Sequence, residues 1–222
     1  MEVQSETMKE LLRIGIPSSM QMGVEVGAFA VSGIIIGTIG AVSQAAHQIA
    51  LSCAAFTFMV SMGLSQAGSI RVSNAFGRGD WKKISVIGKT TLVAALIYGS
   101  FCAICFIFFR WQLPLIFNGD PEVVRLSALL LLFAAVFQIS DATQATGAGL
   151  LRGIKDVRVP TVLITLAYWV IGLPVGWIFA FPYGMGAAGM WLGLILGLTL
   201  ASLFLGFRFL KMARKHNLNP EF

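Results

Sequence analysis

Two acidic side chains, Glu25 and Asp141, lie deep within long apolar stretches of this sequence. A charge at the centre of a bilayer costs at least ~2.5 kcal/mol, and charges in that position usually face a watery cavity or an ion pathway. Carboxylates placed there can bind a metal cation or exchange a proton. The pair is therefore the first candidate for a functional site, with a polar packing contact between helices as the alternative.

Polar side chains accompany both acids at helical spacing. Offsets of −7, −4 and +7 from Glu25 fall on one face of an α-helix, and the residues there are Ser18, Gln21 and Ser32. Offsets of three on either side of Asp141 hold amides, and a serine precedes it directly: Gln138, Gln144 and Ser140. We expect Gln21, Gln138, Ser140 and Gln144 to support the two acids.

The elements that position these residues are membrane-spanning helices. The chain has 222 residues, of which 57% are hydrophobic and 12% charged, whereas soluble domains carry roughly 25% charged residues. Its mean hydropathy is +0.82. Spanning ~30 Å of hydrocarbon takes about 20 residues per helix. The sequence predicts an all-α integral membrane bundle with six spans at 14–37, 44–75, 85–110, 122–151, 160–181 and 186–209.

The loops between these spans predict the orientation. Of the 16 lysines and arginines, only Arg110 and Arg125 fall at one end of the bundle. The end with the excess of positive charge is normally cytoplasmic. We therefore expect both termini in the cytoplasm, with residues 1–13 as an N-terminal segment, 14–210 as the six-helix unit and 211–222 as a tail. No signal peptide is expected in 1–13, which is polar.

Counting residues from the predicted cytoplasmic ends of their helices places the two acids at a common depth. Glu25 lies 11 residues after Ile14, and Asp141 lies 11 residues before Arg152 on a helix that runs in the opposite direction. At ~1.5 Å per residue, both carboxylates are about 16 Å from the cytoplasmic face. Coupling-ion sites of transporters commonly lie near this midplane. A common depth permits contact between the acids without requiring it.

Other features predict packing rather than chemistry. Small residues repeat every fourth position in the sixth span, at Gly189, Gly193, Gly197 and Ala201, which allows close helix contact. Pro174 should bend the fifth span. We expect the three cysteines, Cys53, Cys102 and Cys105, to pack in apolar surroundings. The two histidines, His47 and His216, are too far apart to suggest a zinc site.

Several function classes are disfavoured by these patterns. No catalytic or metal-binding constellation is present, so we expect neither an enzyme nor a cofactor. The net charge of +6 is spread over four short loops instead of one basic patch with aromatics, so nucleic acid is not an expected partner.

Two longer stretches resemble the multidrug and toxic compound extrusion (MATE) transporters. The first runs from Gln138 to Gln144 (QISDATQ), and the second from Gly149 to Pro160 (GLLRGIKDVRVP). The segments Ala45–Ala50 (AAHQIA) and Gly15-Ile16-Pro17 resemble the same family. The resemblance covers nearly the whole chain and corresponds to the C-terminal six of the family's twelve helices.

This resemblance implies an antiporter in which two six-helix lobes surround a central cavity. In the family, Na⁺ or H⁺ drives the export of organic cations and drugs. In its NorM-like branch, a Glu and an Asp form the cation site, and they correspond to Glu25 and Asp141. The position of a tyrosine found in some members is Phe137 here.

The coupling ion is left open between two possibilities. A Na⁺ at Glu25 and Asp141 would need further oxygen ligands, whereas a proton carrier needs a carboxyl that burial or a neighbouring acid makes easier to protonate. The expected partners are membrane lipid, organic-cation substrates, and either a missing N-terminal lobe or a second copy. The expected location is the plasma (bacterial inner) membrane.

Two other functions remain as alternatives. The first is a flippase for lipid-linked oligosaccharides in the same superfamily, although no basic residue lies mid-helix to meet a pyrophosphate. The second is a pore or assembly subunit that transports nothing by itself.

Overall fold

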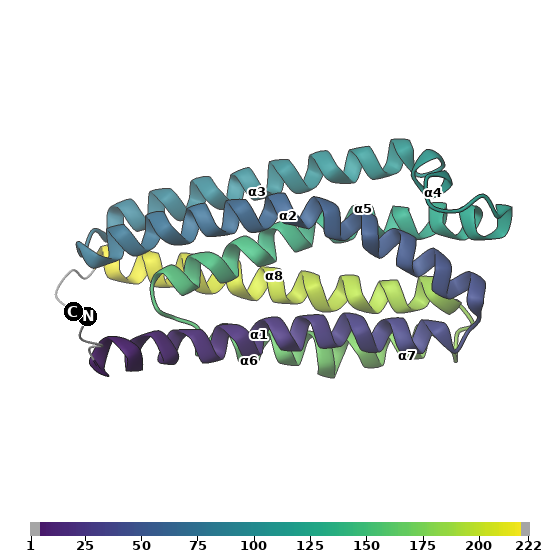
Figure 1. Cartoon of the computed structure of the whole chain (residues 1–222). Helices are drawn as coiled ribbons and strands as arrows, with labels where there is room; N and C mark the ends of the chain where they lie inside the picture. The colour runs from purple at the N-terminus through teal and green to yellow at the C-terminus, as the bar shows by residue number, and fades with distance from the viewer. Residues whose placement is uncertain (1–4, 219–222) are drawn as a thin grey trace.

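The computed structural model describes residues 5–218 as a bundle of long helices, so the predicted all-α class is confirmed (Figure 1). Five helices run without interruption: α1 (Ser5–Gly37), α2 (Ala41–Gly77), α3 (Trp81–Phe109), α5 (Pro121–Gly153) and α8 (Gly186–Leu218). A sixth rod consists of α6 (Arg158–Thr165), the π-helix η1 (Leu166–Gly172) and α7 (Leu173–Ala180). A short helix, α4 (Gln112–Leu115), joins α3 to α5. Within the described residues, six helices are long and apolar enough to span a membrane.

The helices at both ends of the chain are longer than the apolar segments alone predicted. α1 begins at Ser5, inside the predicted N-terminal segment 1–13, and α8 continues to Leu218, inside the predicted tail 211–222. Residues 1–4 and 219–222 of these two segments lie outside the described residues. The polar turns belong to the helices because backbone hydrogen bonds extend a helix beyond its apolar region.

α5 forms the centre of the bundle and packs against α2, α3 and α8 (Figure 1). Its contact with α2 is close because α5 carries glycines there. A Cβ at Gly149 would lie 2.2 Å from the hydroxyl oxygen of Ser65, and one at Gly153 would lie 2.8 Å from the carbonyl oxygen of Ser69. The Ser65 hydroxyl also donates to the carbonyl of Ala145 at 2.7 Å. This contact fixes the rotation of α5, which carries Asp141.

The predicted small-residue face of the sixth span is confirmed. On α8, a Cβ at Gly193 would lie 2.3 Å from the carbonyl oxygen of Gly172 and from the backbone nitrogen of Gly176. Only hydrogen at these positions allows two backbones to approach so closely.

The fifth span departs from α-helical geometry just before Pro174, where a bend was predicted. The π-helix η1 occupies Leu166–Gly172, and α7 begins at Leu173 with the proline in its first turn. Proline removes one backbone donor, and in membrane helices a local π adjustment is one way to satisfy the backbone groups that proline frees. The widened turn carries Tyr168, which is fully buried.

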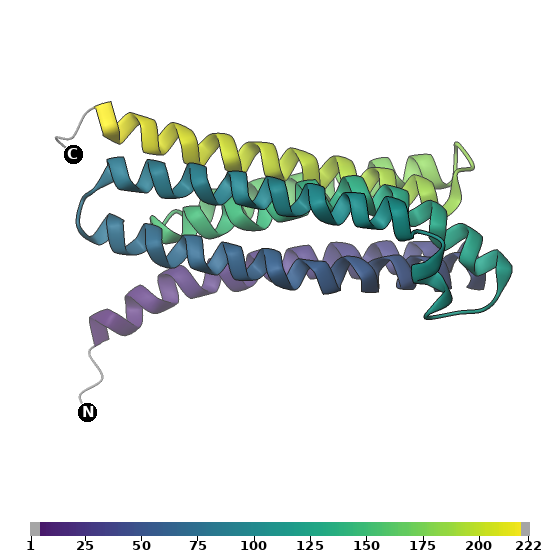
Figure 2. The same cartoon turned by 90° about the horizontal axis from the view of Figure 1, so that it is seen from above.

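α1 is the least embedded of the long helices. It contacts α2 and the α6–η1–α7 rod, and its first turns lean away from the other helices (Figure 2, purple). The first turns of α1 and the last turns of α8 lie at the same end of the bundle (Figure 1). An even number of spans agrees with this placement, and the side of the membrane on which this end lies stays a prediction.

Candidate functional site

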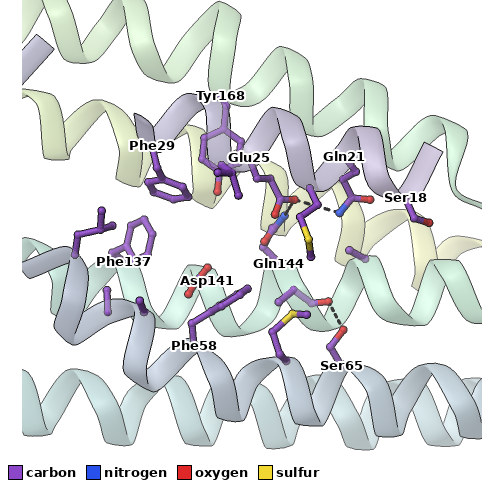
Figure 3. A pocket seen from close by; sticks show the side chains of 18 of the residues that line it. Ser18, Gln21, Glu25, Phe29, Phe58, Ser65, Phe137, Asp141, Gln144 and Tyr168 are labelled. Atoms are coloured by element: carbon purple, nitrogen blue, oxygen red, sulfur yellow. Dashed lines mark hydrogen bonds between the residues drawn. The ribbon is translucent and has the colours of Figure 1, made fainter. Parts of the chain in front are cut away.

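A cavity of about 370 Å³ lies between α1, α2, α5 and the π-helix η1. Both predicted acids line it, Glu25 from α1 and Asp141 from α5 (Figure 3). Most of the remaining wall is apolar, with aromatic and sulfur-containing side chains at Met22, Phe29, Phe58, Met62, Phe137 and Tyr168. Two acids therefore face one largely apolar cavity from different helices.

Glu25 is held by two amides. Its carboxylate oxygen Oε1 accepts a hydrogen bond from Gln21 Nε2 at 3.1 Å, one turn earlier on α1. The same oxygen accepts a hydrogen bond from Gln144 Nε2 on α5 at 2.8 Å (Figure 3). Both amides are buried, and hydrogen bonds to ionised groups are worth about 1.5–3 kcal/mol each. The Gln144 bond joins α1 to α5 across the cavity.

Asp141 lies one turn before Gln144 and is 6% exposed. Among the residues that the structure describes, none donates a hydrogen bond to its carboxylate. It lines the same cavity as Glu25. The arrangement places a carboxylate with unused acceptor capacity beside a second carboxylate that is already hydrogen-bonded.

Two of the four supporting residues predicted from the sequence point away from this cavity. Gln138 donates to the hydroxyl oxygen of Thr57 and, at 3.3 Å, to the carbonyl of Ala54, both on α2. The Ser140 hydroxyl pairs with the Thr199 hydroxyl of α8 at 2.8 Å. These residues join helices to each other and do not line the cavity.

The helical repeat explains why Gln144 faces the cavity while Gln138 and Ser140 do not. Each residue turns the helix by about 100°, so positions three apart differ by about 60°, and positions six apart by about 120°. Gln138 and Gln144 flank Asp141 on opposite sides, and only Gln144 turns towards α1. Ser140, one residue before Asp141, lies about 100° from it around the axis, about 40° beyond Gln144, and bonds to α8.

Tyr168 stands alone in an apolar run of the fifth span and was not predicted as a site residue. Its side chain lines the cavity with both carboxylates and is 1% exposed. Its ring packs edge-on against Phe29, with 5.8 Å between the ring centroids. Phe29 packs in the same way against Phe137, also with 5.8 Å between the centroids. The only sequence signal was the phenolic hydroxyl itself, because a polar group in a membrane helix needs a polar neighbour.

A buried histidine lies behind this aromatic wall. Trp191 Nε1 donates to His47 Nδ1 at 3.2 Å, and the Trp191 ring packs against Phe137 at 5.7 Å. The Nε2 atom of His47 has no hydrogen-bond partner among the described residues. His47 therefore supports the wall of the cavity from the side facing α8.

One basic side chain, that of Arg152 in the last turn of α5, also lines the cavity. The sequence analysis used Arg152 only to mark the end of its span. The charge acts electrostatically on Glu25. The cavity thus has two acids near its middle and one arginine towards the end of α5.

Comparison with known proteins identifies relatives over nearly the whole chain. The MatE family model matches residues 17–178. The chain is 39% identical over 213 residues to the "Probable multidrug resistance protein NorM" of Agrobacterium fabrum, covering 93% of this chain and 45% of that protein. It is 38% identical over 208 residues to the "Multidrug resistance protein MdtK" of Yersinia pseudotuberculosis, covering 91% and 45% respectively. The chain spans about half the length of the curated relatives it matches.

Solved structures share the fold at lower identity. The eukaryotic MATE transporter AtDTX14 superposes with a TM-score of 0.87 at 24% identity, over 96% of this chain and 50% of that one. The bent form of the Vibrio cholerae MATE transporter VcmN gives a TM-score of 0.83 at 16% identity, over 97% and 49%. In both cases this bundle corresponds to half of the other chain.

Proposed function

Because the chain belongs to the MatE family of multidrug and toxic compound extrusion transporters, we propose that it supplies one lobe of a cation-coupled drug antiporter. The observation that carries the proposal is the pair Glu25 and Asp141, which face one cavity from two helices. The relatives' names, which describe multidrug resistance proteins, support the class of substrate.

In this proposal the two acids bind one coupling cation, Na⁺ or H⁺. Two neighbouring carboxylates repel each other in a cavity of low dielectric constant, and a single positive charge between them removes most of that repulsion. For Na⁺, two further side-chain oxygens in the cavity could serve as ligands. The Tyr168 hydroxyl faces the cavity, and Gln144 gives its NH₂ group to Glu25, which leaves its carbonyl oxygen for a cation.

The same cavity suits an organic cation. It is lined by the aromatic side chains Phe29, Phe58 and Tyr168, and a contact of a cation with an aromatic ring is worth about 0.5–2 kcal/mol. Met22 and Met62 adapt their shape to different apolar groups. With the coupling cation bound, the acids attract a cationic substrate less strongly. Competition for one pair of charges therefore couples ion entry to drug release.

A flippase for lipid-linked oligosaccharides receives less support from the cavity. A pyrophosphate calls for several basic groups, and among the described lining residues Arg152 is the single basic one. Two acids near the middle of the cavity would repel such a substrate.

The lobe is expected to work with a second lobe in a membrane. The other half of the transporter would be an N-terminal lobe or a second copy of this chain, since its relatives are about twice as long. We place the protein in the plasma (bacterial inner) membrane with the ends of α1 and α8 in the cytoplasm, on the basis of the charge bias.

The test measures cation binding directly on the purified chain in lipid nanodiscs. Equilibrium binding of ²²Na⁺ and proton release on Na⁺ addition are compared for the unchanged chain, Glu25→Gln, Asp141→Asn and the double variant. Each single change should abolish binding, and the double variant should be little worse, because the acids act as a unit. Glu122→Gln, on an exposed acid at the start of α5, is the matched control and should bind normally.

A second experiment measures coupled transport. The chain is expressed with a six-helix N-terminal lobe in an efflux-deficient host, and ion-dependent export of a fluorescent organic cation is recorded. Normal ion-dependent export in both single variants would contradict the assigned roles of Glu25 and Asp141.

A further inference from the structure

A second cavity, of about 740 Å³, lies at the end of the bundle where α1 begins. It is formed between the first turns of α1 and the connection from α5 to α6. Its charged lining consists of four basic and two acidic side chains: Lys9, Arg13, Lys155, Arg158, Glu6 and Asp156. None of these residues belongs to the cavity that holds Glu25 and Asp141.

Among the described residues that line this cavity, basic side chains outnumber acidic ones. Asp156 is already engaged, because Arg208 Nε donates to its Oδ2 at 2.6 Å from α8. This leaves Glu6 as the acid that lines the cavity with Lys9, Arg13 and Arg158. Such an excess of positive charge attracts an anion, and phosphate oxygens are preferred partners of arginine.

The cavity lies at the ends of two candidate membrane spans, where lipid headgroups are expected. Arg158 is the first residue of the fifth span, and Arg13 lies in the first turn of the first span, Leu11–Gly37. Further into the bundle the two helices meet, where the Thr161 hydroxyl donates to the carbonyl of Pro17 at 3.1 Å. α1 leans away from its neighbours beyond this contact (Figure 2). The cavity is therefore a wedge that opens at the membrane surface.

Apolar surface continues below the charges, towards the middle of the membrane. Val162 lies one turn beyond Arg158 on α6 and is 56% exposed. Ile16 lies one turn beyond Arg13 on α1 and is 55% exposed. A free phosphate would use only the basic part of this surface. A phospholipid would use both parts, with its headgroup among the basic residues and its acyl chains against the apolar ones.

We propose that this cavity binds the headgroup of an anionic phospholipid, with Arg13 and Arg158 as the main contacts to its phosphate. The bound lipid fills the wedge between α1 and α6 and holds the first turns of α1 against the bundle. Basic pockets between membrane helices bind anionic headgroups in this way, and each basic residue near such a surface contributes roughly fivefold in affinity. This assignment stands independently of the proposed transport function.

The experiment uses native mass spectrometry of the purified, delipidated chain, titrated with phosphatidylglycerol or phosphatidylcholine. The unchanged chain should retain phosphatidylglycerol in preference. Arg13→Gln combined with Arg158→Gln should weaken that binding by roughly 25-fold, the product of two fivefold terms. Lys82→Gln combined with Lys83→Gln removes the same charge at the same end of the bundle, outside this cavity, and should leave binding within twofold.

Two further measurements complete the test. On the unchanged chain, binding of phosphatidylglycerol should weaken with added salt while binding of phosphatidylcholine does not, and this needs no variant to fold. Inorganic phosphate at millimolar concentration should displace little lipid. Equal losses in both double variants, or full displacement by inorganic phosphate, would overturn the assignment to a phospholipid in this cavity.

Discussion

The closest backbone contact in the second half of the chain gives the sharpest prediction about stability. Gly193 on α8 faces Gly172 and Gly176, and a Cβ at Gly193 would lie 2.3 Å from atoms of both glycines. Ordinary contacts of a Cβ begin at 3.4 Å. Gly193→Ala must therefore push α8 and the α6–η1–α7 rod apart by about 1 Å, because backbone atoms have no alternative rotamer.

Gly193→Ala should lower the free energy of unfolding, because overpacking a well-packed contact typically costs about 1–3 kcal/mol. Alanine also favours the helix over glycine by up to about 1 kcal/mol, and this gain must be separated from the clash. Gly206→Ala provides the matched control, because Gly206 lies on the same helix and a Cβ there would meet nothing within 4 Å. The difference between the two variants isolates the steric cost.

The assay is equilibrium unfolding of the purified chain in mixed micelles by increasing SDS, followed by far-UV circular dichroism. Gly193→Ala should be less stable than Gly206→Ala by roughly 1–3 kcal/mol. Because Gly172 ends the π-helix that carries Tyr168, the same variant should also weaken cation binding. Equal stability of the two variants would contradict this prediction, since it would mean that α7 and α8 are not in backbone contact.

Three further outcomes are expected. Tyr168→Phe keeps the ring and removes the hydroxyl, so ²²Na⁺ binding should weaken by about tenfold, the equivalent of one hydrogen-bond-sized interaction; unchanged affinity would remove Tyr168 from the ligand set. Gln138→Leu should lower stability in the SDS assay by about 1 kcal/mol while cation binding stays normal, because its amide bonds to α2 and not to the cavity. In whole cells, impermeant thiol reagents should label a cysteine placed at Asn118 and miss one placed at Lys82, and the reverse pattern would contradict the orientation.

The spans and the two acids could be predicted from the sequence because each follows from local properties. Long apolar segments must form helices in lipid, where every backbone donor needs a partner within its own segment. The hydrogen bond between Gln21 and Glu25 is equally local, since residues four apart lie on one face of any α-helix. The spacing of Gly189, Gly193 and Gly197 likewise identified a packing face before its partner was known.

The partners across helices were decided by the tertiary structure alone. Gln144 reaches Glu25, whereas Gln138, equally close to Asp141 in sequence, bonds to α2. Tyr168 joins the cavity from a span that showed no polar pattern. The sequence fixes angles around one helix axis, but the direction in which each face points depends on the rotation that packing imposes on the helix. Here the contact of Gly149 with Ser65 sets that rotation for α5, and thereby the place of Asp141 beside Glu25.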